Sequence, residues 1–246
     1  MRRRLRSLAL VVTALLPGPI KRAVYRVAFG YRIGRGARIG VVYLDCANLE
    51  MGEHARIRHG VAFVRCGDVR VGAHVFIGPL NVFRGGTRIE LGDYCQVLRL
   101  NVINAIPDHD CTTNPDSSVT IGYGAVVTSE HRIDFTDRVT LGRCSMLAGR
   151  NSSIWTHNRK KTQPVHVGDY CYLGSEIRMA PGAVVPDCCI VSLGSVVGTV
   201  FTEPFTLISG SPARLVRRLT PADGDVLFVK TRNDLPEEPH PAWPTP

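Results

Sequence analysis

The sequence predicts an all-β protein in which the chain winds into a parallel β-helix, a solenoid of stacked coils. The first observation is a six-residue period in residues 167–202. An amphipathic helix would space its apolar residues by three and four, and a half-buried strand by two, so this period fits neither. It fits a chain that turns a corner every six residues and points one aliphatic side chain inward from each side. The aliphatic positions are Val167, Leu173, Met179, Val185, Val191 and Val197.

The second observation is that the same hexads recur upstream with interruptions. In four of the six regular hexads the residue after the aliphatic is Gly or Ala, and the fifth position is mostly small. We therefore expect one solenoid, with loops at residues 44–50, 101–118 and 156–166, where the register breaks. The upstream hexads begin at Ile33, Val71, Ile77, Leu91, Ile121 and Leu141.

The pattern resembles the bacterial hexapeptide-repeat acyltransferases, and among them the O-acetyltransferases. The resemblance covers roughly residues 30–219 and is sharpest at I-S-G-S-P-A-R-L-V-R, which begins at Ile208 and is similar to that family's closing motif. It implies a left-handed β-helix over residues 31–219. The hand comes from the resemblance, because parallel crossovers are otherwise nearly always right-handed.

Residues 1–30 are expected to form an N-terminal helical segment. Residues 1–44 contain ten Lys or Arg and no acid, whereas residues 45–246 contain 20 basic and 21 acidic side chains. Three interpretations of this segment are open: a cap on the first coil, a helix lying on an anionic membrane surface, and a signal peptide. The basic charge forms no stripe within the solenoid, so we do not expect nucleic-acid binding.

Residues 220–246 contain six prolines and are expected to form an extended, Pro-rich C-terminal tail with a short helix near Val226–Thr231. The eight cysteines form no C-x-x-C pair and no Cys/His cluster with zinc-ligand spacing. We interpret them as packing residues in a reducing compartment and expect no metal. The predicted location is the cytoplasm, with peripheral contact to the inner face of the membrane.

The candidate general base is His157. It lies in S-S-I-W-T-H-N-R-K-K, where the hexad register fails after an aromatic residue, and this stretch is similar to the family's catalytic segment. The resemblance implies that the histidine takes a proton from an acceptor hydroxyl or amine as it attacks the thioester of acyl-CoA, in direct transfer. That role requires an imidazole whose other nitrogen is held by an acceptor. His131 is a second candidate, because its ring fits poorly at a fifth position and should be turned out of the coil.

The resemblance also implies that acetyl-CoA lies along the last coils, in a cleft between neighbouring subunits of a homotrimer. Small residues would allow the pantetheine arm to approach the backbone, arginines would bind phosphates as forked donors, and a tyrosine would pack near the acyl group. The predicted cofactor-binding residues are Tyr172, Gly174, Ser175, Ala180, Gly194, Ser195, Arg214 and Arg217.

The sequence therefore predicts an O-acyltransferase that uses acyl-CoA, with acetyl as the expected group, on a saccharide or lipid-linked saccharide of a surface-polysaccharide pathway. N-acylation of an amino sugar is an open alternative. A catalytically silent scaffold is another, because Arg159 stands where many relatives have a histidine. A zinc carbonic anhydrase-like protein would need His131, His157 and His166 on one metal, and their spacing is unlike that family's.

Overall fold

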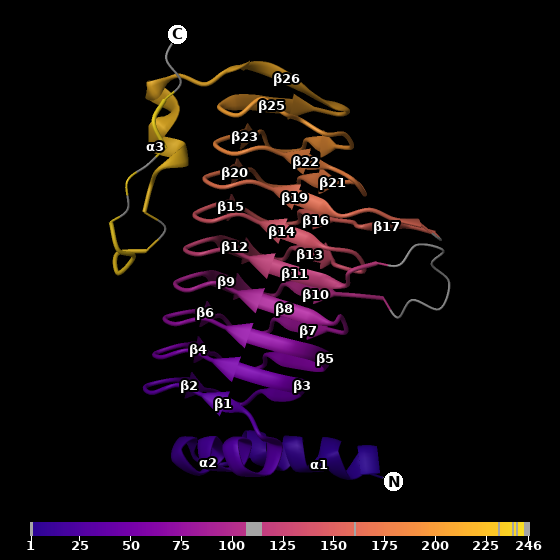
Figure 1. The fold of residues 1–246 in the computed structure, drawn as a ribbon, viewed down its shortest axis with the longest axis vertical. Helices are drawn as coiled ribbons and strands as arrows, with labels where there is room; N and C mark the ends of the chain where they lie inside the picture. Colours follow the sequence, from indigo (N-terminus) through magenta and orange to yellow (C-terminus); the bar gives the residue numbers. More distant parts are fainter. Residues whose placement is uncertain are drawn as a thin grey trace.

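The computed structural model describes residues 2–106, 115–159, 161–230, 232–237, 239 and 241–243. The chain forms a tall, three-sided rod with two helices across its N-terminal end (Figure 1). Apart from one closing strand and one small hairpin, all strand pairs are parallel and join successive coils. The predicted all-β, left-handed parallel β-helix is confirmed.

Each coil of the rod contributes one short strand to each of three faces. The first face contains β1 (Arg32–Ile33), β8 (Arg88–Leu91), β11 (Ser118–Ile121), β14 (Val139–Leu141), β19 (Val165–Val167) and β22 (Val184–Val185). The second contains β2 (Arg38–Ile39), β4 (Arg56–Ile57), β6 (Phe76–Ile77), β9 (Gln96–Arg99), β12 (Val126–Ser129), β15 (Met146–Leu147), β20 (Tyr172–Leu173), β23 (Ile190–Val191) and β25 (Thr206–Gly210). The third contains β7 (Val82–Arg84), β10 (Val102–Asn104), β13 (Arg132–Asp134), β16 (Ser153–Ile154), β21 (Arg178–Met179) and β24 (Val196–Val197).

Two longer strands, β3 (Tyr43–Met51) and β5 (Ala62–Val71), turn a corner in the early coils. Their first residues pair on the third face and their last residues on the first face. The two faces are therefore joined there into one continuous sheet. The predicted irregular stretch at 44–50 is thus a bent strand, because a strand with a local irregularity can turn without losing its ladder.

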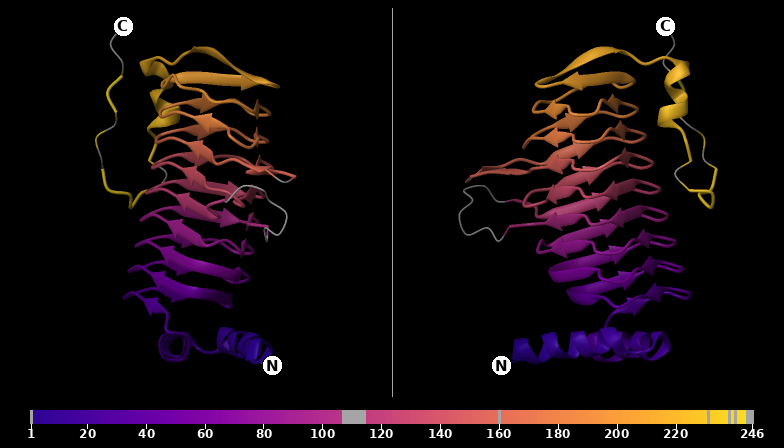
Figure 2. Two further views of the ribbon diagram at one scale, coloured as in Figure 1. Left: turned by 45° about the vertical axis from the view of Figure 1, so that its right-hand side comes forward. Right: turned by 180° about the vertical axis from the view of Figure 1, so that it is seen from behind.

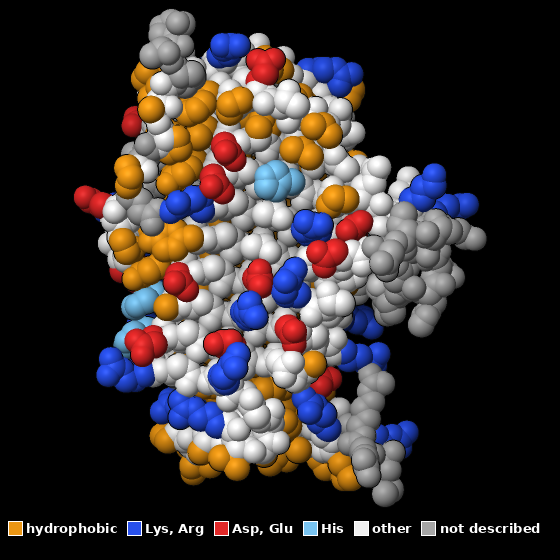
Figure 3. All heavy atoms as spheres, viewed as in Figure 1, with side chains coloured by type: hydrophobic (Ala, Val, Ile, Leu, Met, Phe, Trp, Pro, Cys, Tyr) orange, Lys and Arg blue, Asp and Glu red, His pale blue; other side chains and the backbone are white. Residues whose placement is uncertain are grey.

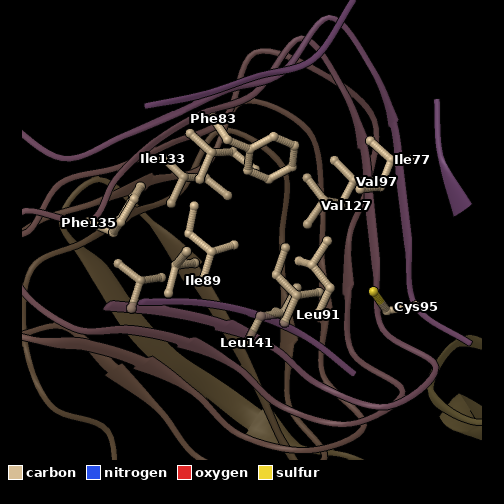
Figure 4. Close-up of a cluster of buried hydrophobic side chains, with 14 of the residues drawn as sticks. Ile77, Phe83, Ile89, Leu91, Cys95, Val97, Val127, Ile133, Phe135 and Leu141 are labelled. Carbon is tan, nitrogen blue, oxygen red and sulfur yellow. The ribbon is translucent and has the colours of Figure 1, made fainter. Parts of the chain in front are cut away.

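The interior of the rod consists of aliphatic and aromatic side chains stacked coil upon coil. The aliphatic residue of each regular hexad in 167–202 is at most 1% exposed. Figure 4 shows such side chains from several coils pointing toward the same axis, among them Ile77, Phe83 and Leu141. The Phe63 and Phe83 rings stack with centroids 4.4 Å apart. Because the interior is filled, chemistry has to take place on a face or at a corner.

The N-terminal segment is helical, as α1 (Arg2–Leu15) and α2 (Gly18–Phe29). Both helices lie flat across the end of the rod (Figure 2). Pro19 stands in the first turn of α2, where a missing amide costs nothing, and Gly30 ends the helix in a left-handed conformation. Among the described residues, neither helix is long and apolar enough to cross a membrane.

The inner side of these helices satisfies the open edge of the first coil. Lys21 is 4% exposed and donates to the Gly40 carbonyl at 2.6 Å, and Arg6 donates to the Cys46 carbonyl at 2.8 Å. Burial lowers the pKa of the Lys21 amine. An uncovered sheet edge leaves carbonyls without partners, so these cations complete the ladder that the first coil cannot complete alone.

The C-terminal end closes with β26 (Ala213–Arg218), which pairs antiparallel with β25. A turn of 3₁₀ helix, η1 (Pro221–Asp223), and the short α3 (Gly224–Leu227) follow. The tail then runs back beside the rod (Figure 1), where Leu227 and Leu235 are 4% and 7% exposed. The described part of the tail is therefore packed rather than simply extended, because its apolar residues find partners on the rod.

Candidate active site

A short hairpin projects from the corner between the third and first faces, where the hexad register fails. It consists of β17 (His157–Asn158) and β18 (Lys161–Thr162), which pair antiparallel. It extends outward from the side of the rod (Figure 1). An antiparallel hairpin can satisfy its own backbone outside the coil, which is why a break in the period produces a projection here.

His157 at the start of this hairpin is bonded to a buried carboxylate. Its Nδ1 is hydrogen-bonded to Oδ2 of Asp134, which lies one coil earlier at the end of β13. An ionised carboxylate only accepts hydrogen bonds, so Nδ1 carries the proton in this contact. The lone pair of a neutral imidazole is then at Nε2. The residue is therefore set up to take a proton at that atom.

Asp134 is itself held by backbone and hydroxyl donors. Its side chain is 1% exposed, and its Oδ1 accepts from the Thr136 amide at 3.0 Å and the Thr136 hydroxyl at 2.6 Å. The Thr156 amide donates to Oδ2 at 3.3 Å. Donors to both oxygens stabilise the charged form of a buried carboxylate and fix its plane. The orientation of His157 is thus set by two neighbouring coils.

The exposed surface around His157 is suited to a substrate. The His157 side chain is 21% exposed, and the ring of Trp155 lies edge-on to it with centroids 6.1 Å apart. Trp155 is 36% exposed, so its flat apolar ring also faces solvent. Nε2 of His157 makes no hydrogen bond to any residue that the structure describes. A reachable base beside an aromatic surface is an arrangement that can bind an acceptor and deprotonate it.

His131 has a different position from the one that we expected. It is 1% exposed, inside the rod, rather than turned out of the coil. The Ser152 amide donates to its Nδ1 at 3.1 Å, and its Nε2 bonds the Thr128 hydroxyl at 2.8 Å. These partners make the large ring acceptable at a position that usually holds a small residue. Burial lowers the pKa of His131 to about 4, so the ring is neutral near pH 7.

The predicted cofactor residues do not all lie near His157. Ala180 follows β21 and is next to Trp155 in register, since the Trp155 amide donates to the Met179 carbonyl at 3.0 Å. The pairs Gly174–Ser175 and Gly194–Ser195 lie at the opposite edge of the third face, between the second and third faces. Within one chain the structure therefore brings only Ala180 to the corner of the base.

Two of these small residues, Gly174 and Ser195, contribute to packing and hydrogen bonding within the rod. A side chain at Gly174 would place its Cβ 2.8 Å from the Leu193 amide nitrogen, so the close stacking of coils requires glycine there. The Ser195 hydroxyl donates to the Ser192 carbonyl at 2.7 Å and accepts from the Gly210 amide at 3.2 Å. Its side chain thus contributes to the fold, and only its backbone can approach a ligand.

Tyr172, on the second face, packs against a different part of the molecule. It is half-buried and lines a cavity of about 400 Å³ between β20 and the returning tail, together with Met146 and Leu227. The tail therefore occupies one side of Tyr172 in this structure.

The two predicted phosphate ligands differ in how free they are. Arg217 makes a two-point ion pair with Asp223, at 2.9 and 2.7 Å, and this contact holds the pKa of the Asp223 carboxyl well below its usual range. Among the residues that the structure describes, Arg214 donates only to the carbonyl of Ala213, at 2.9 Å. Both residues lie on β26. Arg214 has more donors available for a phosphate than Arg217.

Asp134 is the residue of the site that was not predicted. The sequence signal for a carboxylate partner was the Ile-Asp pair at the end of a regular strand, with Thr136 two residues after the Asp. A second threonine, Thr156, stands directly before His157. An acceptor for the second ring nitrogen is required of a histidine base, and the carboxylate meets that requirement. It could not be selected by spacing because 23 residues separate it from His157.

The described residues also bear on the zinc alternative. They contain no group of three or more His, Cys, Asp or Glu close enough together to hold a metal ion. Both ring nitrogens of His131 are hydrogen-bonded in the interior, while His166 is exposed on β19. The three histidines named for such a site are therefore not brought together. The seven cysteines that the structure describes are all free.

Comparison with solved structures gives proteins that share the fold. No protein-family model matches the chain. The chain is similar to the polysialic acid O-acetyltransferase OatWY, at 18% identity over 83% of this chain and 89% of that one, with a TM-score of 0.42. It is also similar to the polySia specific acetyltransferase NeuO, at 16% identity over 85% and 84%, TM-score 0.48. A third is the hexapeptide-repeat containing acetyltransferase VCA0836 from Vibrio cholerae, at 15% over 88% and 90%, TM-score 0.39.

Proposed function

We propose that the protein is an acyl-CoA-dependent O-acyltransferase that transfers an acetyl group directly to a saccharide hydroxyl, with His157 as general base. The observation that carries the proposal is the Asp134–His157 pair. A buried, fully bonded carboxylate holds Nδ1 of a partly exposed imidazole, beside an exposed tryptophan. The hexapeptide motifs and the segment around His157 support the same assignment.

In the proposed reaction, the acceptor hydroxyl oxygen attacks the thioester carbonyl carbon while Nε2 of His157 removes its proton. The C–S bond then breaks, and the proton passes from Nε2 to the leaving sulfur, which yields free CoA and the ester. Asp134 stabilises the imidazolium that forms between these two steps, and donors from Thr136 and Thr156 hold its carboxylate in place. Trp155 supplies an apolar surface for a sugar ring.

We also propose that the active unit is a homotrimer. Within one chain, the base lies at the corner of the third and first faces, whereas Gly174, Gly194 and Arg214 lie at other edges of the rod. Cyclic packing of three rods would set the corner of one subunit against another edge of its neighbour. A shared cleft formed in this way would bring the base of one subunit beside the predicted cofactor-binding residues of its neighbour. The free cysteines agree with work in the cytoplasm, where acyl-CoA is formed.

The test is release of free CoA thiol from acetyl-CoA, measured with a panel of oligosaccharide and amino-sugar acceptors. We expect turnover with a hydroxyl acceptor that is lost in His157→Gln and kept in the matched control His166→Ala, which changes an exposed histidine on the adjoining face. Turnover that survives His157→Gln would overturn the base assignment. If no acceptor supports turnover and acetyl-CoA does not bind, the protein is a scaffold. A monomeric mass in solution would overturn the shared cleft.

A further inference from the structure

The outer side of the helical cap is an apolar face that the rod leaves uncovered. Its members are large aliphatic residues on α1 and α2, each between 49% and 88% exposed. They are Leu5, Leu8, Val11, Val12, Leu15, Ile20 and Val27. Figure 3 shows hydrophobic side chains along this end of the molecule, below a row of Lys and Arg. We call this set the outer cap face. A continuous apolar surface of this kind marks an interaction site rather than ordinary exposure.

The two sides of each helix have separate roles. On α1, Leu10 is fully buried against the first coil, whereas Leu8 and Val12 point the other way and are 61% and 54% exposed. On α2, Tyr25 is buried and Val27 is 88% exposed. Covering the first coil therefore uses only one side of each helix. The cap requirement accounts for the inner side and leaves the outer cap face without an explanation in the fold.

The charge around this face indicates its partner. Residues 1–44 carry ten Lys or Arg and no acid. Arg4, Arg35 and Arg38 are exposed, whereas the Lys21 amine is buried and donates a hydrogen bond to the first coil. A second copy of the chain would bring two such positive ends together, which is unfavourable. An anionic lipid surface complements both the apolar face and the charge, and short amphipathic helices bind such surfaces by lying in the interfacial plane.

We propose that the outer cap face docks flat into an anionic bilayer leaflet, so that the rod stands upright on the membrane. This placement determines the height of the site. Along the third face the strands run β3, β5, β7, β10, β13 and β16, five strand spacings from the first coil to the coil of His157. At ~4.8 Å per spacing, the base lies ~24 Å above the first coil, with the cap beneath it.

A lipid head group at the bilayer surface cannot reach this height, but a saccharide chain on a lipid carrier can. Resting on the proposed function, the inference is that the acceptor is a lipid-linked oligosaccharide, modified at a sugar remote from the lipid rather than at the first one. The rod acts as a spacer that selects the distance between the membrane and the modified sugar.

Binding is tested by flotation of the full-length protein with vesicles of phosphatidylcholine alone and of phosphatidylcholine mixed equally with phosphatidylglycerol. We expect binding to the anionic vesicles and a loss of about tenfold or more in the double variant Leu8→Glu/Val12→Glu, because two apolar anchors become repelling charges. The matched control is Leu80→Glu/Leu100→Glu, which changes leucines of similar exposure, 55% and 44%, on the side of the rod.

The outcomes separate this inference from the proposed function. Equal vesicle binding by wild type and Leu8→Glu/Val12→Glu would overturn the docking face. So would a wild-type protein that ignores anionic vesicles and self-associates through this face instead. Where the protein is active, the variant should keep turnover on a water-soluble oligosaccharide and lose it on the same saccharide linked to lipid in vesicles. Vesicle binding without turnover on any acceptor would leave the docking face standing and overturn the enzyme.

Discussion

His131 and His157 lie on consecutive coils of one rod, yet their surroundings give them opposite roles. His131 is enclosed, and an amide and a hydroxyl bond its two ring nitrogens. His157 is partly exposed, and a carboxylate bonds one ring nitrogen. Uncharged partners in a dry interior favour the neutral ring and keep it neutral. The Asp134 carboxylate orients the His157 ring, so of these two histidines His157 is the one placed to exchange a proton with a substrate.

The comparison shows that position relative to the hexad register decides what a histidine does in this fold. Where the register holds, as at His131, the ring lies in the interior, at a hexad position that usually holds a small residue. Where the register fails, as at His157, the side chain leaves the coil and meets solvent.

Replacing His157 by alanine should lower kcat about 10²- to 10⁴-fold, the usual contribution of a positioned acid–base group. Thermal stability should change little, because the residue lies on a projecting hairpin. The measurement is steady-state acetyl-CoA turnover, with His166→Ala as the control. A wild-type kcat in His157→Ala would show that His157 is not the general base, and the contrast in role with His131 would be wrong.

Replacing Asp134 by asparagine should also lower kcat, by a factor at the lower end of the range for acid–base catalysis, about 10²-fold. Donors reach both carboxylate oxygens, so an amide has to turn its NH₂ group toward Thr136 or toward His157. The base then loses its acceptor or its orientation. Turnover per folded molecule is the quantity to compare, with Asp137→Asn as the control at a half-buried neighbour. An unchanged kcat in Asp134→Asn would show that the pair is structural.

His131 should make the fold acid-sensitive. The pKa of His131 is lowered from 6.5 to about 4 in the folded protein. Between these pH values the imidazole therefore binds a proton in the unfolded chain but not in the folded chain. The free energy of unfolding should fall between pH 6.5 and 4, by on the order of 3 kcal/mol from this group, and be fully restored above pH 6.5. Urea unfolding at fixed protein concentration, compared with His131→Gln, isolates it. Parallel pH profiles of the two proteins would contradict burial of a neutral ring.

Replacing Thr128 by valine should have the smallest effect, a loss of about 1 kcal/mol in the free energy of unfolding. The hydroxyl bonds Nε2 of His131 and the Leu147 and Gly149 carbonyls, and valine has nearly the same shape. Catalysis should not change, since this network does not touch the corner of His157. A fall in kcat without a fall in the free energy of unfolding would show that the Thr128–His131 network affects the site at His157.

The sequence alone determined the solenoid and its interior. A six-residue period leaves one geometry in which every sixth side chain faces inward, and the observed aliphatic positions are buried as this requires. It also located the break at which His157 leaves the coil. Both inferences are local, because period and register are properties of consecutive residues.

Only the tertiary structure decided which residues meet at the corners. Arg132 pairs with Ser153, 21 residues further on, and Ser153 pairs with Arg178, 25 further on, because insertions lengthen some coils. A regular period therefore cannot say that Asp134 lies beside His157. In the same way, stacking placed the His131 ring between an amide and a hydroxyl that bond its two nitrogens, and it paired Arg217 with Asp223. The period determines what faces inward, whereas the unequal lengths of the coils determine which outward residues become neighbours.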